Sequence, residues 1–241
     1  MLKHKIKNMN SLHDFQKNGY IQINPINKNN TSFSNKFSFN GDYADLIRDK
    51  KDAGSLKVDK PYLEKNFYKY IKLLTDHHYL NTAEKIIGTR LYPLKLMHVI
   101  NDDKTKELIW HRDIYSHNGK RIGPPWPLFK LAIYLQDTNK ENGITGFIPG
   151  FLNLNFGNKY FDTLYAYIVS PFSYHAKLFK GQSILFKGNV MHHRPKAKSN
   201  AHREAIIFSL TSSKETAKDY LKNNKSFLFN YINTTDVKIT S

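Results

Sequence analysis

The segment Trp110-His111-Arg112-Asp113 limits the folds open to this chain more than any other feature. In a β-strand, successive side chains point to opposite faces, so His111 and Asp113 project to one side and can bind the same cation, with Arg112 turned away. A third ligand is available far downstream, in Met191-His192-His193-Arg194-Pro195. Two histidines and one carboxylate cover one face of an octahedral iron and leave the opposite face open, as oxygen chemistry requires. We therefore expect a fold that brings these two segments together.

A strand signal follows the downstream histidines. Arg203 opens the run Glu204-Ala205-Ile206-Ile207-Phe208-Ser209-Leu210, which is typical of a buried strand. Two-residue alternation places Arg203, Ala205, Ile207, Ser209 and Thr211 on one face, where the small neighbours of Arg203 leave room for a dicarboxylate. The planar guanidinium fork suits a carboxylate of a small dianionic cosubstrate.

With these residues the chain resembles the phytanoyl-CoA dioxygenase-like (PhyH) branch of the iron(II)- and 2-oxoglutarate-dependent oxygenases. The resemblance covers roughly residues 90 to 212. It includes, in order, Leu131-Ala132-Ile133-Tyr134-Leu135-Gln136-Asp137, Glu141-Asn142-Gly143, Ile148-Pro149-Gly150 and Lys180-Gly181-Gln182-Ser183-Ile184-Leu185-Phe186. After Gly150 the chain departs from the family, because Phe151-Leu152 stand where relatives commonly carry Ser-His. The departure predicts a differently shaped pocket mouth.

The resemblance implies a mainly β fold with flanking helices and a double-stranded β-helix core, that is, a cupin-like jelly roll. We expect a single domain over residues 1–241: N-terminal loops and supporting helices (1–89), the core (90–212), and a C-terminal helix and tail (213–241). The implied iron ligands are His111, Asp113 and His192, with His193 as the alternative if its strand is bulged. The implied 2-oxoglutarate contacts are Arg203, Ser209, His98 and Asn101, although packing within a strand would also account for His98.

The implied activity is hydroxylation of an unactivated C–H bond by molecular oxygen, coupled to conversion of 2-oxoglutarate to succinate and carbon dioxide. Halogenating relatives replace the carboxylate ligand with a small residue, so Asp113 favours hydroxylation. Two alternatives stay open. One is a catalytically silent jelly roll that binds an anionic ligand or nucleic acid, which a solvent-facing Arg203 or metal ligand would favour. The other is a two-histidine, one-carboxylate enzyme that does not use 2-oxoglutarate.

Two segments are candidates for the surroundings of the substrate. Glycines and prolines between Ile114 and Pro127 predict a loop beside the proposed iron, with Lys120, Arg121 and Trp126 as candidate substrate contacts. Trp126 is equally well explained as a residue that pins the loop to the barrel. The aromatic segment Asn153 to Tyr174 is a candidate lid or pocket wall, with simple packing as the alternative.

The net charge of the chain limits the chemical classes of partner that it can be expected to bind. The chain has 37 Lys and Arg against 20 Asp and Glu, a formal net charge of +17, and no cysteine. The charge favours an anionic small-molecule substrate, phosphorylated, carboxylated or an acyl thioester, unless it reflects only a lysine-rich solvated surface. Nucleic acid is not expected as a partner, because no nucleic-acid-binding motif is present. No apolar run approaches the roughly 18 to 20 residues that span a bilayer, and no signal-peptide core follows the N-terminus, so we expect a cytoplasmic enzyme.

Helical spacing of apolar residues predicts a helix from Lys60-Pro61 to Leu74. A second helix is predicted from Asn81 or Thr82 to Ile87, with Thr82 as N-cap and Gly88 as its stop. A strand is predicted over 91–100, and a C-terminal helix from Ser212 or Ser213 to Leu221. Pro195 should end the strand that carries the distal histidine.

Overall fold

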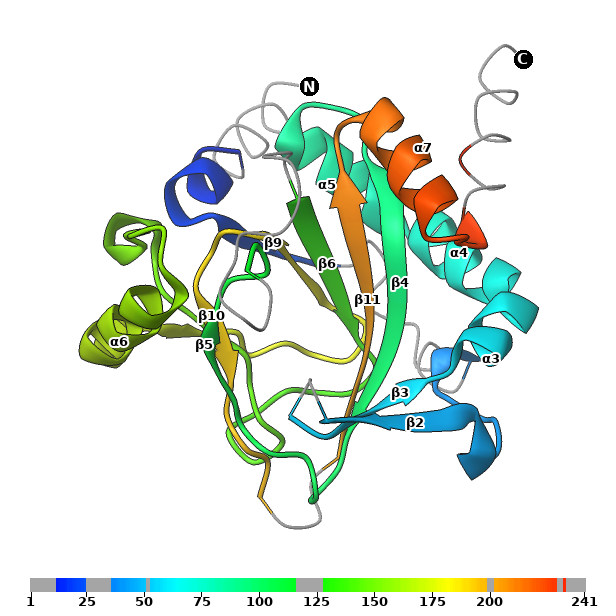
Figure 1. Cartoon of the computed structure of the whole chain (residues 1–241), viewed down its shortest axis with the longest axis horizontal. Coiled ribbons are helices and arrows are strands. Elements are labelled where there is room, and N and C mark those ends of the chain that lie inside the picture. The colour runs from blue at the N-terminus through cyan, green and yellow to red at the C-terminus, as the bar shows by residue number, and fades with distance from the viewer. Residues whose placement is uncertain are drawn as a thin grey trace.

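The computed structural model describes residues 12–24, 36–50, 53–115, 128–198, 202–228 and 232. Within these ranges the strands form two antiparallel sheets that face each other (Figure 1). The larger has seven strands in the order β1-β9-β6-β11-β4-β3-β2, and the smaller has four in the order β5-β10-β7-β8. Their bounds are β1 Tyr20–Ile23, β2 Leu46–Asp49, β3 Ser55–Val58, β4 Tyr92–Asn101, β5 Leu108–His111, β6 Leu128–Tyr134, β7 Gly146–Phe147, β8 Tyr174–His175, β9 Ser183–Lys187, β10 His192–Arg194 and β11 Arg203–Thr211. This is the predicted jelly-roll arrangement.

The register of β11 decides which side chains face the space between the sheets. Ala205 lies opposite Val99 of β4 and Tyr134 of β6, and Ile207 lies opposite Met97 and Ala132. Directly opposed residues in antiparallel strands share a face. The interior therefore receives the alternate residues that begin with Arg203, as the sequence predicts, and the next set, Glu204, Ile206, Phe208 and Leu210, faces outward.

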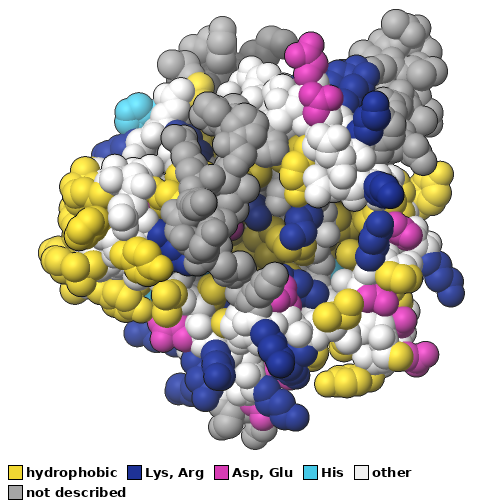
Figure 2. All heavy atoms as spheres, viewed as in Figure 1, with side chains coloured by type: hydrophobic (Ala, Val, Ile, Leu, Met, Phe, Trp, Pro, Cys, Tyr) yellow, Lys and Arg dark blue, Asp and Glu magenta, His cyan; other side chains and the backbone are white. Residues whose placement is uncertain are grey.

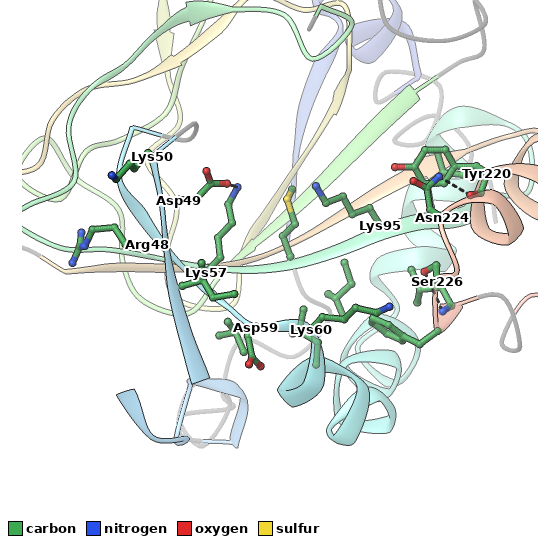
Figure 3. Close-up of a pocket in the computed structure, with 18 residues that line it drawn as sticks. Arg48, Asp49, Lys50, Lys57, Asp59, Lys60, Lys95, Tyr220, Asn224 and Ser226 are labelled. Carbon is green, nitrogen blue, oxygen red and sulfur yellow. Dashed lines mark hydrogen bonds and ion pairs between the residues drawn. The ribbon is translucent and has the colours of Figure 1, made fainter. Parts of the chain in front are cut away.

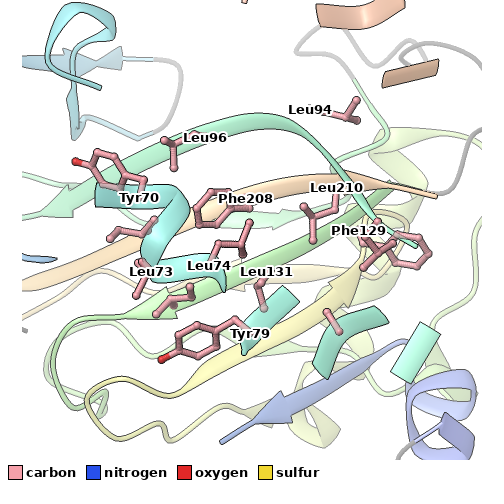
Figure 4. Close-up of a cluster of buried hydrophobic side chains, with 14 of the residues drawn as sticks. Tyr70, Leu73, Leu74, Tyr79, Leu94, Leu96, Phe129, Leu131, Phe208 and Leu210 are labelled. Carbon is pink, nitrogen blue, oxygen red and sulfur yellow. The ribbon is translucent and has the colours of Figure 1, made fainter. Parts of the chain in front are cut away.

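The outward face of the large sheet is covered by helices and holds the main apolar core. Tyr70, Leu73 and Leu74 of α4 and Tyr79 of α5 pack with Leu96, Leu131, Phe208 and Leu210 of the sheet (Figure 4). The helices on this side are α3 Lys60–Lys65, α4 Phe67–Asp76, α5 Tyr79–Ile87 and α7 Lys214–Asn223. None of the helices in the described ranges has the length and apolar character to cross a membrane.

The helix boundaries differ from the predicted ones where the backbone leaves helical geometry. The single helix predicted over 60–74 is divided into α3 and α4 at Asn66, which has φ −101° and ψ 16°. α5 begins at Tyr79 and not near Thr82, because His78 adopts a left-handed conformation with φ 57° at its N-cap.

Two predicted helix ends are confirmed. Gly88 ends α5 with φ 81°, and the Ser213 side chain caps α7 by accepting a hydrogen bond from the Thr216 N–H.

The aromatic segment Asn153 to Tyr174 forms a helix that periodicity did not predict. Helix α6, Lys159–Val169, lies against β5 on the outer face of the small sheet (Figure 1). Its buried residues pack with Trp110, Ile148 and Met191. Helix α6 is therefore not a wall of the interior, whereas Tyr174 at the end of the segment lies opposite Phe147 and shares its interior face.

Candidate active site

Three potential metal ligands from two distant segments meet between the sheets. Ligand atoms of His111, Asp113 and His192 all lie within 4.8 Å of one another. The register explains the meeting, because His192 of β10 lies directly opposite His111 of β5. β5 ends at His111, so Asp113 lies in the turn that follows the strand and not on the strand itself. Its carboxylate nevertheless approaches His192 Nε2 to 3.8 Å.

Backbone carbonyls fix the orientation of both imidazole rings. His111 Nδ1 lies 2.8 Å from the Ile109 carbonyl oxygen, and His192 Nδ1 lies 3.0 Å from that of Val190. A carbonyl oxygen only accepts, so both Nδ1 atoms carry a proton, and the Nε2 atoms are the positions at which the two rings would bind a metal. Such an outer hydrogen bond is how metal-binding histidines are commonly held.

Local electrostatics keep His192 and Asp113 in the protonation states that a cation needs. Burial, reinforced by His111, lowers the pKa of His192 to about 3, so this imidazole is neutral at physiological pH. Burial alone would raise the pKa of Asp113, but Lys130, 3.8 Å from the carboxylate, and the two histidines outweigh it and lower that pKa. The aromatic rings of Phe147 and Phe186 pack on His192, with centroids 6.0 and 4.9 Å away.

His193 lies on the opposite face of β10. Its ring stacks on the Trp110 indole with centroids 3.9 Å apart, on the α6 side of the small sheet. It is His192, and not His193, that shares a face with His111.

Arg203 occupies a second buried part of the interior and is 6% exposed. Its Nη1 donates to the Gly143 carbonyl at 2.8 Å and its Nη2 to the Tyr134 hydroxyl at 3.4 Å. Its Nε is buried with no hydrogen-bond partner in the described part of the chain. Gly143 is required at this contact, because its φ is +77° and a Cβ there would lie 2.7 Å from the Pro195 carbonyl oxygen. A buried guanidinium with an unused donor fits a ligand carboxylate.

Asn101 lies directly opposite Arg203 on β4, so the two share the interior face. The Asn101 side-chain oxygen accepts a bond of 2.9 Å from Arg194 Nη1, which also donates to Ser55 Oγ at 3.0 Å. The structure therefore brings Asn101 to the Arg203 end of the interior and fixes its amide with a second buried arginine. β10 ends at Arg194, as Pro195 predicts.

The structure does not bring His98 to this site. His98 lies opposite Ile206, on the outward face of the large sheet, and is fully buried. Its Nε2 lies 2.6 Å from Glu204 Oε1 and its Nδ1 2.8 Å from the Tyr70 hydroxyl. A cosubstrate contact through His98 is inconsistent with this placement, because the β4–β11 ladder separates its ring from the interior.

Ser209 also lies apart from Arg203, six residues along β11 and so roughly 20 Å away by strand rise. Its cross-strand neighbours are Lys95 of β4 and Lys130 of β6, which gives the metal end of the interior two ammonium groups. Sequence reasoning missed both lysines. The signal was present in Leu128-Phe129-Lys130-Leu131-Ala132-Ile133-Tyr134, where alternation places Lys130 on the same face as Ala132 and Tyr134.

Lys95 also lines a groove with a volume of about 810 Å³, which runs along the edge of β4 beyond its pairing with β3 and is bordered by the β2–β3 hairpin and α7. Lys57 and Lys95 extend to the same side of the large sheet, and Lys57 is paired with Asp49 at 2.7 Å (Figure 3). Desolvation by the surrounding protein lowers the pKa of Lys95, and Lys130 lowers it further. The remaining predicted substrate contacts, Lys120, Arg121 and Trp126, lie outside the described residues.

Arg112, between the two ligands of the first motif, points away from the metal position and anchors the surrounding chain. It donates from Nε to Asp162 of α6 at 2.9 Å and from Nη1 to Asn153 Oδ1 at 2.8 Å. It also bonds the carbonyls of Asn189 and Leu154. Arg112 thus joins the turn that carries Asp113 to the outer helix and to the loop before the distal histidine.

Comparison with known proteins decides the family. A model of the family described as phytanoyl-CoA dioxygenase (PhyH) matches residues 29–205, which is most of the chain. The chain belongs to the phytanoyl-CoA dioxygenase family. The predicted enzyme class, a 2-oxoglutarate-dependent non-haem iron oxygenase, is confirmed by this membership, and the donor set and buried arginine fit iron(II) and 2-oxoglutarate. Burial of Arg203 and His192 also weighs against a catalytically silent PhyH module.

Solved structures share the fold at low sequence identity. EctD from S. alaskensis, crystallised with 2-oxoglutarate and 5-hydroxyectoine, has a TM-score of 0.65 and 15% identity over 84% of this chain and 75% of its own. The epimerase SnoN from nogalamycin biosynthesis has a TM-score of 0.61 and 14% identity over 87% and 84%. AviO1 from Streptomyces viridochromogenes has a TM-score of 0.58 and 17% identity over 85% and 94%. No curated protein sequence matches the chain. These similarities confirm the predicted double-stranded β-helix.

Proposed function

We propose that the protein hydroxylates an unactivated C–H bond of an anionic small molecule, using iron(II), 2-oxoglutarate and molecular oxygen. The observation that carries the substrate class is the pair of lysines, Lys95 and Lys130, that flank Ser209 at the metal end of the interior.

His111, Asp113 and His192 would hold iron(II) through two Nε2 atoms and one carboxylate. Bound there, the metal supplies oxygen activation coupled to conversion of 2-oxoglutarate into succinate and carbon dioxide. The protein contributes two imidazole rings, each fixed by a backbone carbonyl, and an ionised Asp113. Phe147 and Phe186 exclude water from the His192 side of the site.

Arg203 would bind the far carboxylate of 2-oxoglutarate. Its contacts with Gly143 and Tyr134 hold the guanidinium in place, and its Nε remains available. Asn101, held by Arg194, borders the same end of the interior. Binding there orients the cosubstrate from the Arg203 end of the interior and leaves the Lys95 end for substrate.

Lys95 and Lys130 would bind the substrate anion. The two ammonium groups, on the strands that flank β11, repel each other, and an anion between them relieves that repulsion. Lys130 is already near Asp113, so Lys95, which also lines the groove in Figure 3, is the ammonium that is open to an incoming molecule. A phosphorylated, carboxylated or acyl-thioester substrate fits this arrangement.

The test has two stages. Anaerobic titration of 2-oxoglutarate into the iron(II)-loaded protein should produce a visible charge-transfer band; its absence in folded, metal-loaded protein would overturn the oxygenase assignment. Succinate formation is then measured with matched sets of phosphorylated, carboxylated and neutral small molecules. Lys95→Met should weaken stimulation by the anionic members and leave 2-oxoglutarate binding unchanged, whereas Lys177→Met, at an exposed residue outside the interior, should change neither. Equal stimulation of wild type and Lys95→Met would overturn the substrate class.

A further inference from the structure

Most of the exposed large apolar side chains in the described residues come from one segment, 151–179. The segment holds 11 of 15 such residues, and ten of them form what we call the α6 ledge: Phe151, Leu154, Phe156, Tyr160, Phe161, Leu164, Tyr167, Ile168, Phe172 and Phe179. The eleventh, Tyr174, lies opposite Phe147 and stacks on Tyr20, so it faces the interior and is not part of the ledge. Figure 2 shows hydrophobic side chains gathered over α6, at the left of the view. The remaining four are Tyr43, Ile47, Tyr68 and Ile109.

Helix α6 presents this apolar surface because it is amphipathic in the opposite sense to an ordinary surface helix. Phe161, Leu164 and Ile168 follow helical spacing and are 62%, 61% and 68% exposed. The side that packs on β5 is formed by Ala166, Val169 and the single carboxylate, Asp162. A surface helix normally turns its apolar stripe toward the core. The outward stripe therefore requires another explanation.

The ledge is larger than the apolar patches that monomeric proteins usually tolerate. A fully exposed aromatic side chain offers roughly 150–250 Å². Phe151, Tyr160, Phe161 and Phe172, each 62–72% exposed, therefore contribute on the order of 500 Å² before the aliphatic residues are added. Patches above a few hundred Å² usually mark an interaction surface.

Charge identifies the kind of surface that would cover the ledge. The only acidic side chain in residues 151–179 is Asp162, which is 1% exposed and paired with Arg112. The lysines of the segment are Lys159 and Lys177, and the whole chain carries +17. A second copy of the chain would bring the same positive charge, whereas an anionic lipid surface is complementary to it. Aromatic and aliphatic residues with flanking lysines are typical of surfaces that enter the headgroup region.

We propose that the α6 ledge docks the protein onto an anionic lipid surface, with Phe161, Leu164 and Ile168 in the headgroup region. Thr163 of the same helix donates to the Trp110 carbonyl at 3.1 Å, and Asp162 holds Arg112. Docking through α6 therefore leaves the helix between the lipid and β5, the strand that carries His111 of the candidate metal site. The proposal is independent of the iron chemistry, so metal-free protein should bind as well as loaded protein.

The test is co-sedimentation of the full chain with vesicles of phosphatidylcholine, with and without phosphatidylglycerol. We expect binding to the anionic vesicles that weakens as salt is raised, and little binding to the neutral ones. Loss of each large apolar side chain should lower the partition coefficient of the protein between water and the vesicles about tenfold. The triple variant Phe161→Ser/Leu164→Ser/Ile168→Ser should therefore lose binding at least a hundredfold.

A matched control is Tyr43→Ser/Ile47→Ser/Tyr68→Ser, whose residues are 72%, 57% and 85% exposed and lie outside the ledge. It should bind vesicles as wild type does, and both variants should unfold at the wild-type temperature. Absence of wild-type binding, or equal losses in both triple variants, would overturn the proposal. A stable dimer of wild type that the ledge variant converts to monomer, without any vesicle binding, would assign the ledge to a second copy and also overturn it.

Discussion

Replacing Arg203 with glutamine tests the cosubstrate end of the site most directly. The guanidinium is buried, and its described contacts leave Nε unpaired and Nη2 with only a 3.4 Å bond. About two charge-assisted hydrogen bonds are thus available to a carboxylate, each contributing roughly 1.5–3 kcal/mol. Allowing for the polar group that glutamine retains, we expect Arg203→Gln to lose about 2–4 kcal/mol of 2-oxoglutarate binding. That loss corresponds to a Kd raised roughly 30- to 1000-fold.

The assay is the anaerobic charge-transfer titration, with iron(II) affinity measured separately. Arg203→Lys keeps the charge but not the planar fork, so its Kd should lie between those of Arg203→Gln and wild type. Glu204→Gln changes the next residue, which faces the other side of the sheet, and should leave the Kd unchanged. Iron affinity should stay within about threefold of wild type in all three, since neither residue contacts the ligand triad. A Kd for Arg203→Gln within threefold of wild type, in folded protein, would refute the assignment.

Three further predictions concern the metal, acid stability and the outer helix. Asp113→Ala should abolish iron(II) binding in a competition assay with a fluorescent chelator, and wild-type affinity would contradict the ligand set. Hydrogen bonds from His202 and His98 outweigh burial and lower the folded-state pKa of Glu204 to about 2, below its ordinary 4.5. The associated stability, up to about 3 kcal/mol, is present above pH 4.5 and lost as pH falls toward 2, so denaturant unfolding of Glu204→Gln should depend less on pH across that window. Asp162→Asn removes the charge partner of buried Arg112 and should cost about 3–5 kcal/mol in urea unfolding, and a loss below 1 kcal/mol would show that the pair is dispensable.

Local sequence patterns predicted the elements whose side chains alternate strictly or whose ends carry capping residues. The alternation after Arg203 placed the interior face of β11, and Gly88 and Ser213 marked helix ends, because these features depend on backbone geometry within a few residues. The division at Asn66 and the start of α5 at His78 were not predicted, because they depend on how two helices fit over one sheet.

Helix α6 was missed for a related reason. Its sequence, Lys-Tyr-Phe-Asp-Thr-Leu-Tyr-Ala-Tyr-Ile-Val, has apolar residues on more than one side, so no single buried face was evident. Only the structure shows that Asp162 and Ala166 face the core, together with Tyr165, and that the other large side chains face outward. Burial of Asp162 depends on Arg112, fifty positions earlier, which no local pattern reveals.

The sequence by itself determined the chemistry of this protein, because His-x-Asp, a distal histidine and a following arginine are residue types that few other functions need together. The tertiary structure alone decided which of those residues meet. Strand register set His192 opposite His111, turned His193 toward Trp110, and placed His98 with Glu204 on the far side of the sheet. It also set Lys95 and Lys130 beside Ser209. Register is fixed by packing over the whole sheet, and a shift of one residue would exchange every interior side chain for an exterior one.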